Sequence, residues 1–415
     1  MLKGASFPVI AAFNETLVLE SIRRSRSGLS RVELSRETSL SAQTLSNVSR
    51  RLLERGLIRE AGSRRVQGPG KPPTILRLEP SGAFAVGVHL DPSVITCVLL
   101  NLRGEIVREI RRHPPESGDA PETLAQVADA IGELIRTSEV SASRIAGIGV
   151  AAPGPIDASA GVLVRPRLAP GWTDFHLSDD LQAKLGLPVT LTKDVTAAIL
   201  AEDWTNPTDA RSNYAFLYWG TGVGVGLVLD GDVHAGATQN AGDVGHAIVD
   251  PDGPACVCGR RGCFGEVVRP YRMVVEALER GAIPRPENIT GPIDPAIPLS
   301  LETIDHLFHT LGQRASRGDQ AALSVVDHAA RSTALFVSNL AALLDLDRVV
   351  FGGPSWAPVR DRMLEILPGE LAAATAESIA HPVVLATSAI GDDVAAVGAA
   401  CLVLERTFSP RSALR

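Results

Sequence analysis

Three of the five cysteines in this 415-residue chain lie within eight positions, at Cys256, Cys258 and Cys263. Glycines between them allow a loop tight enough to bring three sulfur atoms together. His246, ten residues before the first cysteine, can add a fourth ligand. Three thiolates and one imidazole form a closed tetrahedral set, which is typical of structural rather than catalytic zinc sites. The alternative is a group of buried cysteines without metal. The spacing favours a structural Zn2+ site.

The cysteine content and the hydropathy of the chain indicate its cellular compartment. An odd number of cysteines, crowded into one segment, is typical of a reducing compartment. No apolar run reaches the roughly 18 to 20 residues that a transmembrane helix requires, and the N-terminus lacks a signal-peptide pattern. We therefore expect a soluble, cytoplasmic protein without membrane contact. The length predicts roughly two to three domains.

Charge is distributed unevenly along the chain. Residues 1–80 contain 14 Lys and Arg against 7 Asp and Glu, a net charge of +7. The whole chain contains 40 against 47, so the remainder has 26 against 40, a net charge of −14. A basic module attached to an acidic body is expected when one end binds nucleic acid. An arginine-rich helical surface without such a role is the alternative.

Local signals divide the basic module into three helices. The first begins near Asn14, where apolar residues start to recur at helical spacing. Ser30 and Glu33 form a capping box for the second helix. Ser41 caps the third, which Gly56 terminates. Two short helices joined by a tight turn predict a helix-turn-helix, whose second helix enters the major groove of DNA.

The third helix has an apolar face and a polar face. Leu45, Val48, Leu52 and Leu53 form the face that we expect to be buried. Polar side chains able to contact bases or phosphates occupy the other face, and these are Gln43, Thr44, Ser46, Asn47 and Arg50.

Two short alternating runs follow and flank the segment SRRVQGPGKPP. They predict a β-hairpin wing whose tip carries Arg64, Arg65 and Lys71. Capped helices, a polar helix face and a basic wing together predict a winged helix-turn-helix DNA-binding domain over residues 1–80. A small helical interaction domain is the alternative.

Beyond residue 80 the pattern changes to strands that alternate with helices, which predicts an α/β fold with functional groups on loops at the strand ends. Four segments then carry a family likeness. GIGVAAPGPID (147–157), GTGVGVG (220–226), GDVGH (242–246) with PDGPACVCGRRGC after it, and VVFGGPS resemble the blocks of the ROK family in the same order. This is a family of repressors, open reading frames and sugar kinases. The N-terminal module resembles the DNA-binding module of the family's repressor branch.

The resemblance implies an actin-like (ribonuclease H-like) body of two α/β lobes with a sugar bound in the cleft between them. It places a small lobe at residues 81–194, completed by residues 386–415. It places a large lobe with the zinc loop at residues 195–385.

The resemblance also implies candidate sugar-binding residues. The kinases use the Asp of an Asn-Asp pair as general base on a sugar hydroxyl, and the matching pair here is Lys193-Asp194. A sugar-binding Glu position matches Asp243. A second Glu position is Gly265, with Glu266 one residue later. The implied set is Lys193, Asp194, Asp243, His246 and Glu266, in which His246 would bind zinc with one ring nitrogen and a sugar hydroxyl with the other.

The phosphate end departs from the kinase pattern. The kinases begin with a segment like Asp-x-Gly-Gly-Thr, whereas this chain has HLDPSV, with His89 at the Asp position and Asp91-Pro92-Ser93 in place of the turn. Proline has no amide to donate, and side chains crowd the approach of a phosphate. Since phosphoryl transfer depends on holding and neutralising the phosphates, we expect ATP to bind poorly or not at all.

These features together predict a sugar-responsive transcription regulator, a repressor, that is not an enzyme. Its partners would be operator DNA, a sugar or sugar phosphate, and further copies of the chain in a homodimer or homotetramer. One alternative is an ATP-dependent sugar kinase with a DNA-binding head that uses Asp194 as general base. Another is a regulator that responds to a protein partner and has a vestigial cleft.

Overall fold

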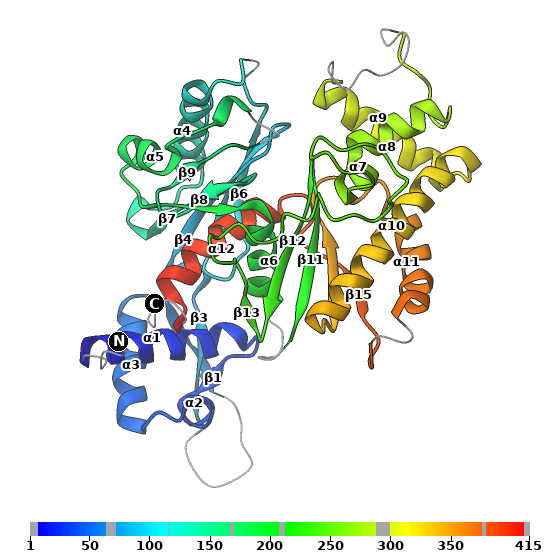
Figure 1. Ribbon diagram of the computed structural model, residues 1–415. Helices are drawn as coiled ribbons and strands as arrows, with labels where there is room; N and C mark the ends of the chain where they lie inside the picture. Colours follow the sequence, from blue (N-terminus) through cyan, green and yellow to red (C-terminus); the bar gives the residue numbers. More distant parts are fainter. Residues whose placement is uncertain are drawn as a thin grey trace.

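The computed structural model describes residues 7–63, 72–115, 117–166, 170–206, 212–287, 299–375 and 379–410. A helical head with a small sheet lies at one end of the molecule, and two α/β lobes extend from it on either side of a central pair of helices (Figure 1). Within these residues, no helix combines the length and apolar character needed to cross a membrane.

In its described residues, 7–63 and 72–78, the head contains three helices and one small sheet. Its elements are α1 (Phe7–Arg24), β1 (Leu29–Ser30), α2 (Arg31–Thr38), α3 (Ala42–Glu54), β2 (Ile58–Ser63) and β3 (Thr74–Leu78). The strands pair antiparallel in the order β1-β3-β2. The predicted capping box of α2 is present, because Glu33 N donates to Ser30 Oγ and Ser30 N donates to Glu33 Oε2. Helix α3 begins after Ser41, as predicted.

Two details of the head differ from the sequence interpretation. Helix α1 begins at Phe7, about two turns before the predicted start near Asn14, and buries Val18, Leu19 and Ile22. On α3, Leu45, Val48 and Leu52 are buried as predicted, but Ser49 is buried with them and Leu53 is only half-buried. The apolar stripe is therefore rotated slightly, because α3 packs against α1 as well as α2.

The first lobe is built on the described strands β4 (Phe84–Leu90), β5 (Ile95–Asn101), β6 (Ile106–Arg112), β7 (Ile145–Ala152) and β10 (Val189–Lys193), in the order β10-β7-β4-β5-β6. Alternate residues of β4 face opposite sides of this sheet. Phe84, Val86 and Val88 join the hydrophobic cluster that includes residues of α4 and α5, while Ala85 joins the cluster that includes α12. The remaining elements are η1 (Pro80–Gly82), α4 (Ala120–Thr137), η2 (Ala142–Arg144), β8 (Ile156–Asp157), β9 (Val162–Leu163), η3 (Pro170–Trp172) and α5 (Leu177–Leu185).

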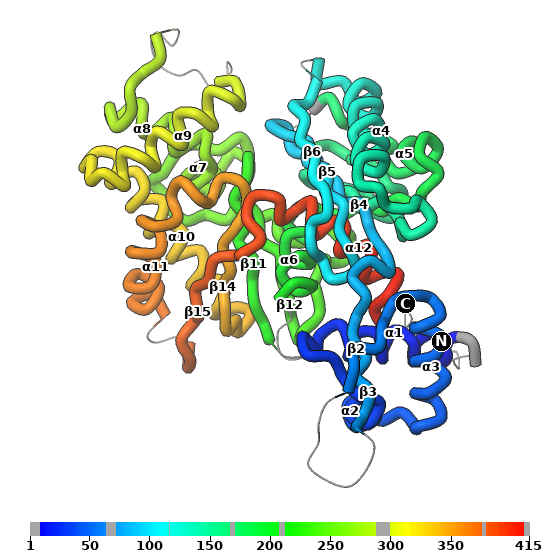
Figure 2. Tube along the Cα trace, turned by 180° about the vertical axis from the view of Figure 1, so that it is seen from behind, coloured from blue at the N-terminus to red at the C-terminus, as the bar shows by residue number. Residues whose placement is uncertain are grey.

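The second lobe has its own sheet. In the described ranges its strands are β11 (Tyr214–Trp219), β12 (Val223–Leu229), β13 (Asp232–Val233), β14 (Arg348–Gly352) and β15 (Val384–Thr387), in the order β13-β12-β11-β14-β15. The predicted glycine-rich hairpin is β11–β12, joined around Gly220. Helices pack outside this sheet (Figure 2), and these are α7 (Phe264–Val268), α8 (Pro270–Glu279), α9 (Leu301–Ser316), α10 (Gln320–Leu344) and α11 (Arg360–Thr375).

Two helices, α6 (Asp194–Thr205) and α12 (Val394–Phe408), cross between the two sheets (Figure 1). Glycines permit this crossing, because a Cβ at Gly398 of α12 would lie 1.7 Å from Ala197 O of α6. In the same way, Gly87 and Gly149 let α12 approach the first sheet, where a Cβ would lie within 2.0 Å of a carbonyl oxygen of α12. The C-terminal end of α12 lies beside α1 of the head in both views (Figures 1 and 2).

Candidate functional site

A cavity of about 340 Å3 lies between the two lobes. The first lobe contributes the loop after β7 with Pro153, Gly154 and Pro155, together with the junction of β10 and α6. The second lobe contributes the turn of the glycine-rich hairpin, the loop after β13 and the start of α7. The cavity brings together the residues that the resemblance implied for sugar binding, which are Lys193, Asp194, Asp243, His246 and Glu266.

Asp194 begins α6 and is half-buried at the cavity wall. Burial raises the pKa of its carboxyl group, and the charges of Lys193 and His89 oppose this change. A carboxylate in such a position is a strong hydrogen-bond acceptor for a hydroxyl group, because few water molecules compete with the ligand.

Lys193 and Asn240 connect the two sides of the cavity. The buried Lys193 ammonium group donates to Asn240 O at 3.3 Å and to Ala241 O at 3.5 Å. The Asn240 side chain exchanges two hydrogen bonds with the backbone of Ile156, each 2.8 Å long. The lysine that replaces the Asn of the kinase pair therefore holds the loop after β13 against the first lobe. Asn240 was missed by the sequence analysis because nothing in its local pattern indicates a partner 84 residues away.

Tyr218 is a further cavity residue that sequence reasoning missed. Its ring meets the imidazole of His89 edge-on, with 6.2 Å between ring centroids. Both residues are buried, and neither Tyr218 Oη nor His89 Nε2 has a hydrogen-bond partner among the described residues. Burial, followed by the charges of Asp91 and Asp194, raises the pKa of Tyr218 well above its usual range. A neutral, buried hydroxyl without a protein partner is suited to a polar ligand.

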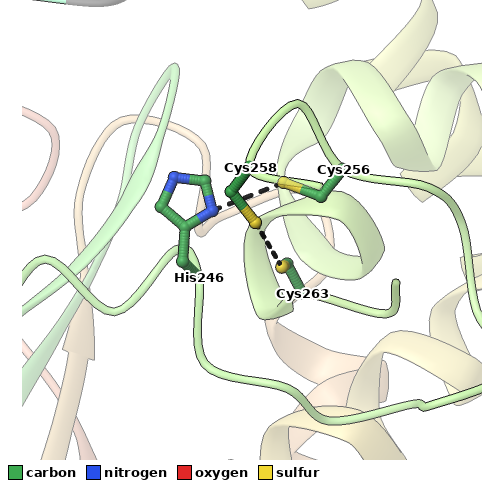
Figure 3. A group of neighbouring side chains, drawn as sticks. All are labelled: His246, Cys256, Cys258 and Cys263. Atoms are coloured by element: carbon green, nitrogen blue, oxygen red, sulfur yellow. Dashed lines mark hydrogen bonds between the residues drawn. The ribbon is translucent and has the colours of Figure 1, made fainter. Parts of the chain in front are cut away.

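The cysteine loop forms one wall of this cavity. Ligand atoms of His246, Cys256, Cys258 and Cys263 all lie within 4.8 Å of one another (Figure 3). His246 Nδ1 lies 3.3 Å from Cys256 Sγ, and the sulfurs of Cys258 and Cys263 are 3.6 Å apart. These separations fit a tetrahedron around Zn2+, whose edge between two sulfurs is about 3.8 Å for Zn–S bonds of about 2.3 Å.

Glycine makes the cysteine loop possible. Gly262 has φ +61°, and a Cβ there would lie 1.3 Å from Asp250 O, so no other residue fits. Since Nδ1 of His246 faces the sulfurs, Nε2 is on the opposite edge of the ring, and His246 also lines the cavity. The donor set could bind a metal, and it places the imidazole between that position and the cleft.

Glu266 of α7 is paired with two arginines. Arg269 Nη2 lies 3.1 Å from Glu266 Oε1, and Arg272 forms a second ion pair with the same carboxylate. At Gly265, a Cβ would lie 3.2 Å from Gly245 O, so the glycine at the second Glu position lets α7 approach the GDVGH segment closely. Glu266 is thus fixed in orientation at the cavity wall by Arg269 and Arg272, which the sequence analysis did not identify.

The turn between β4 and β5 is closed by internal hydrogen bonds. Asp91 Oδ1 accepts from Ser93 N at 2.8 Å and from Ser93 Oγ at 2.5 Å. It also accepts from Thr221 Oγ1 of the glycine-rich hairpin at 2.8 Å. A backbone amide and hydroxyl groups of this kind are what a bound phosphate needs, and here an aspartate of the same chain already engages them.

The residues predicted to contact DNA differ in their exposure, and some lie outside the described residues. Gln43, Ser46, Asn47 and Arg50 are exposed along α3. Thr44 is half-buried and takes part in the helix cap, because its backbone N and its Oγ1 both bond Ser41 Oγ. The wing residues Arg64, Arg65 and Lys71 lie outside the described residues.

Comparison with known proteins gives a consistent result. The ROK family profile matches residues 85–406. A glucokinase of Halalkalibacterium halodurans is 30% identical over 335 residues, which are 79% of this chain and 97% of the relative. A xylose repressor of Caldicellulosiruptor bescii is 26% identical over 348 residues, with 83% of this chain and 84% of the relative covered.

A solved structure described as a ROK family transcriptional regulator, homolog of the E. coli MLC protein, superimposes with a TM-score of 0.75 at 23% identity. The match covers 98% of both chains, so it includes the head as well as the body. The predicted fold, a winged helix-turn-helix head followed by an actin-like body of two lobes, is confirmed.

Proposed function

The chain belongs to the ROK family, and we propose that it is a sugar-responsive, DNA-binding transcription regulator, a repressor, without kinase activity. The observation that carries this proposal is the Asp91 carboxylate in the β4–β5 turn. It engages the amide and hydroxyl groups that a phosphate would need, while the neighbouring sugar cavity is open.

DNA binding is supported by the head. The second helix of its helix-turn-helix, α3, presents Gln43, Ser46, Asn47 and Arg50 to the outside, and side chains of these types contact base edges and phosphates. The head is also the basic part of an otherwise acidic chain. Relatives named as repressors share most of its length. The protein would work in the cytoplasm, where its operator DNA is.

A sugar as effector is supported by the chemistry of the cavity. Asp194, Asp243 and Glu266 offer carboxylate acceptors, and Tyr218 Oη is a buried hydroxyl without a partner among the described residues. His246 Nε2 is on the ring edge away from the cysteines. Several polar groups that converge in one concave, partly apolar site are typical of small polar ligands. The cavity lies between the lobes, so its occupant contacts both and stabilises one relative orientation.

Zinc in the cysteine loop would be structural. With three thiolates and one imidazole as ligands, no position remains for a water molecule, so the metal supplies folding energy and no chemistry. It would hold His246 at the cavity wall and tie the loop to the start of α7. The four ligands are His246, Cys256, Cys258 and Cys263.

The proposed response works through an assembly of two or four copies. Two heads on one operator must match half-sites about 34 Å apart, or a multiple of this distance. A sugar that binds one lobe orientation more tightly shifts the population toward that orientation and changes the head spacing. For a repressor, the sugar-bound form has the lower operator affinity.

The test is operator binding with and without sugar. A duplex selected by the full-length protein from a random pool serves as operator, and binding is followed by fluorescence anisotropy with D-xylose, D-glucose and N-acetyl-D-mannosamine. We expect at least one sugar to weaken binding about fivefold or more. If operator binding occurs but does not change with these sugars or their 6-phosphates (5-phosphate for xylose), the effector half of the proposal is wrong, and a protein partner becomes the better explanation.

A sugar kinase with a DNA-binding head is the second candidate. It is favoured by the glucokinase relative at 30% identity and by a second cavity of about 440 Å3 beside Ser93, Thr221 and Arg269, next to the sugar cavity. Asp194 would then be the general base. Sustained ADP release with any of the three sugars, abolished by Asp194→Asn, would establish this activity and overturn the non-enzyme proposal.

A further inference from the structure

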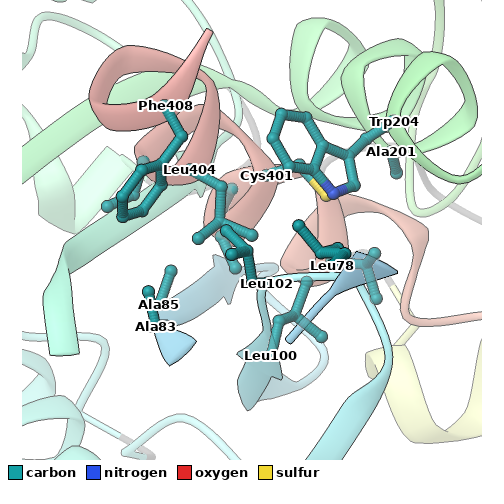
Figure 4. Close-up of a cluster of buried hydrophobic side chains, with 14 of the residues drawn as sticks. Leu78, Ala83, Ala85, Leu100, Leu102, Ala201, Trp204, Cys401, Leu404 and Phe408 are labelled. Atoms are coloured by element: carbon teal, nitrogen blue, oxygen red, sulfur yellow. The ribbon is translucent and has the colours of Figure 1, made fainter. Parts of the chain in front are cut away.

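The head is packed onto the body rather than tethered to it. Strand β3 of the head leads through η1 into β4 without a long linker. A buried cluster, which we call the joint, then connects β3, the first sheet, α6 and α12 (Figure 4). The joint comprises Leu78, Ala83, Ala85, Leu100, Leu102, Ala201, Trp204, Cys401, Leu404 and Phe408, all of them buried. A close-packed joint of this kind transmits displacement instead of absorbing it.

Within this region, one contact links the last turn of α6 directly to the first helix of the head. The guanidinium group of Arg23 on α1 lies over the indole ring of Trp204, 3.9 Å from its centroid. Arg23 Nη1 also donates to Trp204 O at 2.7 Å. A planar cation stacked on an indole and hydrogen-bonded to the same residue is a specific, oriented contact.

Arg23 is itself held rigidly. Glu20 accepts two hydrogen bonds from it, each 2.8 Å long, in the bidentate arrangement that fixes a guanidinium plane. Helix α1 then reaches the recognition helix α3 through Glu15, which forms ion pairs with Arg51 and Arg55. A displacement of Trp204 therefore acts on α1 and, through it, on α3.

The other end of α6 lies in the sugar cavity. Asp194 is its first residue and Trp204 its eleventh, so about 15 Å of continuous helix separates the cavity from the head. The helix is buried over almost its whole length. The backbone of α6 is in close contact with α12 on one side and with β12 on another. A Cβ at Gly398 of α12 would lie 1.7 Å from Ala197 O, and a Cβ at Gly226 of β12 would lie 2.5 Å from Val195 O. These close contacts with α12 and β12 favour movement of α6 as a rigid body.

We infer that α6 couples the sugar cavity to the DNA-binding head, with the Arg23–Trp204 contact as the output of this coupling; the inference rests on the proposed function. A sugar that hydrogen-bonds Asp194 displaces the N-terminal end of α6, and the rigid helix transfers that displacement through Trp204 to Arg23 and α1. Arg23 and Trp204 are positioning residues, because neither contacts the cavity or the exposed face of α3.

The test uses the full-length chain and compares Arg23→Met, Trp204→Leu and Arg144→Met with wild type. Arg144 is the control, because its Nη1 donates at 2.9 Å to Ser81 O of η1, the turn that leads from the head into the first lobe, and Arg144 itself is on η2 rather than on α6. Operator affinity is measured with and without D-xylose, D-glucose and N-acetyl-D-mannosamine at saturation. The ratio of the two affinities is the coupling factor. By linkage, sugar affinity with and without operator must give the same factor.

We expect Arg23→Met and Trp204→Leu to reduce the coupling factor from about fivefold or more to below about twofold. Sugar affinity measured without DNA should stay within about threefold of wild type, because the cavity is untouched, and Arg144→Met should keep the wild-type factor. If Trp204→Leu does not fold, Arg23→Met alone carries the test, since Arg23 is on the head and α6 is unchanged.

Three results overturn the inference in distinguishable ways. If Arg23→Met keeps the coupling factor of wild type, the cavity and the head are coupled through other contacts, and the proposed function stands. Loss of coupling in Arg144→Met as well shows that any loosening of the head abolishes the response, so α6 has no special role. A wild-type protein that binds operator but responds to none of the sugars removes the effector half of the proposed function and this inference with it.

Discussion

The two ends of the cleft between the lobes differ in how their polar groups are used. At the end formed by the cysteine loop, His246 and Asp243 line an open cavity, and His246 also belongs to the group of four side chains that could bind a metal. At the end formed by the β4–β5 turn, Asp91 bonds Ser93 and Thr221, so donors from both lobes are already satisfied. The polar groups of the cysteine-loop end face a cavity, whereas those of the β4–β5 turn bond one another beside the second cavity. Under the proposed function, this difference would separate ligand binding from phosphoryl transfer.

Removing a metal ligand from the cysteine loop should have the largest effect of these changes, a loss of stability. We expect Cys258→Ser to lose zinc and to lower the unfolding free energy of the second lobe by about 3 kcal/mol or more, because structural zinc contributes folding energy. Metal analysis and thermal unfolding measure both effects. Cys97→Ala is the control, since Cys97 is buried in the first lobe and far from the loop in sequence. Wild-type protein purified without zinc would contradict the metal assignment.

Sugar binding at the open end should depend strongly on Asp194. We expect Asp194→Asn to weaken sugar binding about 10- to 100-fold, the loss associated with hydrogen bonds to a charged group. In wild type, burial raises the pKa of Asp194. Its ionised form is therefore lost, and sugar affinity falls, at a higher pH than for an ordinary aspartate, whose pKa is about 3.8. Calorimetric titration across this range measures the effect, and a pH-independent affinity would count against it.

Replacing Asp91 removes the carboxylate that accepts the hydrogen bonds of the β4–β5 turn. Asp91→Ala leaves Ser93 N and Thr221 Oγ1 available, and we expect binding of a non-hydrolysable ATP analogue to increase about tenfold. Thr221→Val is the matched control, because it removes one donor and the contact between lobes but keeps the carboxylate. Equal nucleotide affinity in wild type and Asp91→Ala, with both binding tightly, would show that the turn was never closed to phosphates.

The smallest expected effect is that of the Lys193 charge on the ionisation of Asp194, at the cavity end of the cleft. The Lys193 charge lowers the pKa of Asp194 against the raising effect of burial, so Lys193→Met should shift the pH dependence of sugar binding to higher pH. At neutral pH the loss in affinity should be about threefold, smaller than in Asp194→Asn. The same titrations, compared between the two variants, measure the shift. An unchanged pH profile would mean that the Lys193 charge does not act on Asp194.

The features predicted well from sequence are those encoded over short stretches. The capping box of Ser30 and Glu33 and the cap at Ser41 involve residues three apart, and each appears as expected. The cysteine loop spans few residues and contains the glycine needed for its tightest turn, so its four ligands meet. The start of α1 was placed too late, because Phe7 to Phe13 lack a cap signal and are helical within the assembled head.

Sequence alone determined the winged helix-turn-helix, the alternation of strands and helices and the loop whose side chains could bind a metal, since helix caps, periodicity and ligand spacing act between near neighbours. Only the tertiary structure decided which distant groups meet. Thr221 reaches Asp91 across 130 positions, Asn240 reaches Ile156 across 84, and Arg23 reaches Trp204 across 181. The physical reason is that these pairs are set by the packing of α6 and α12 between two sheets, where close backbone contact fixes the lobes and the head together.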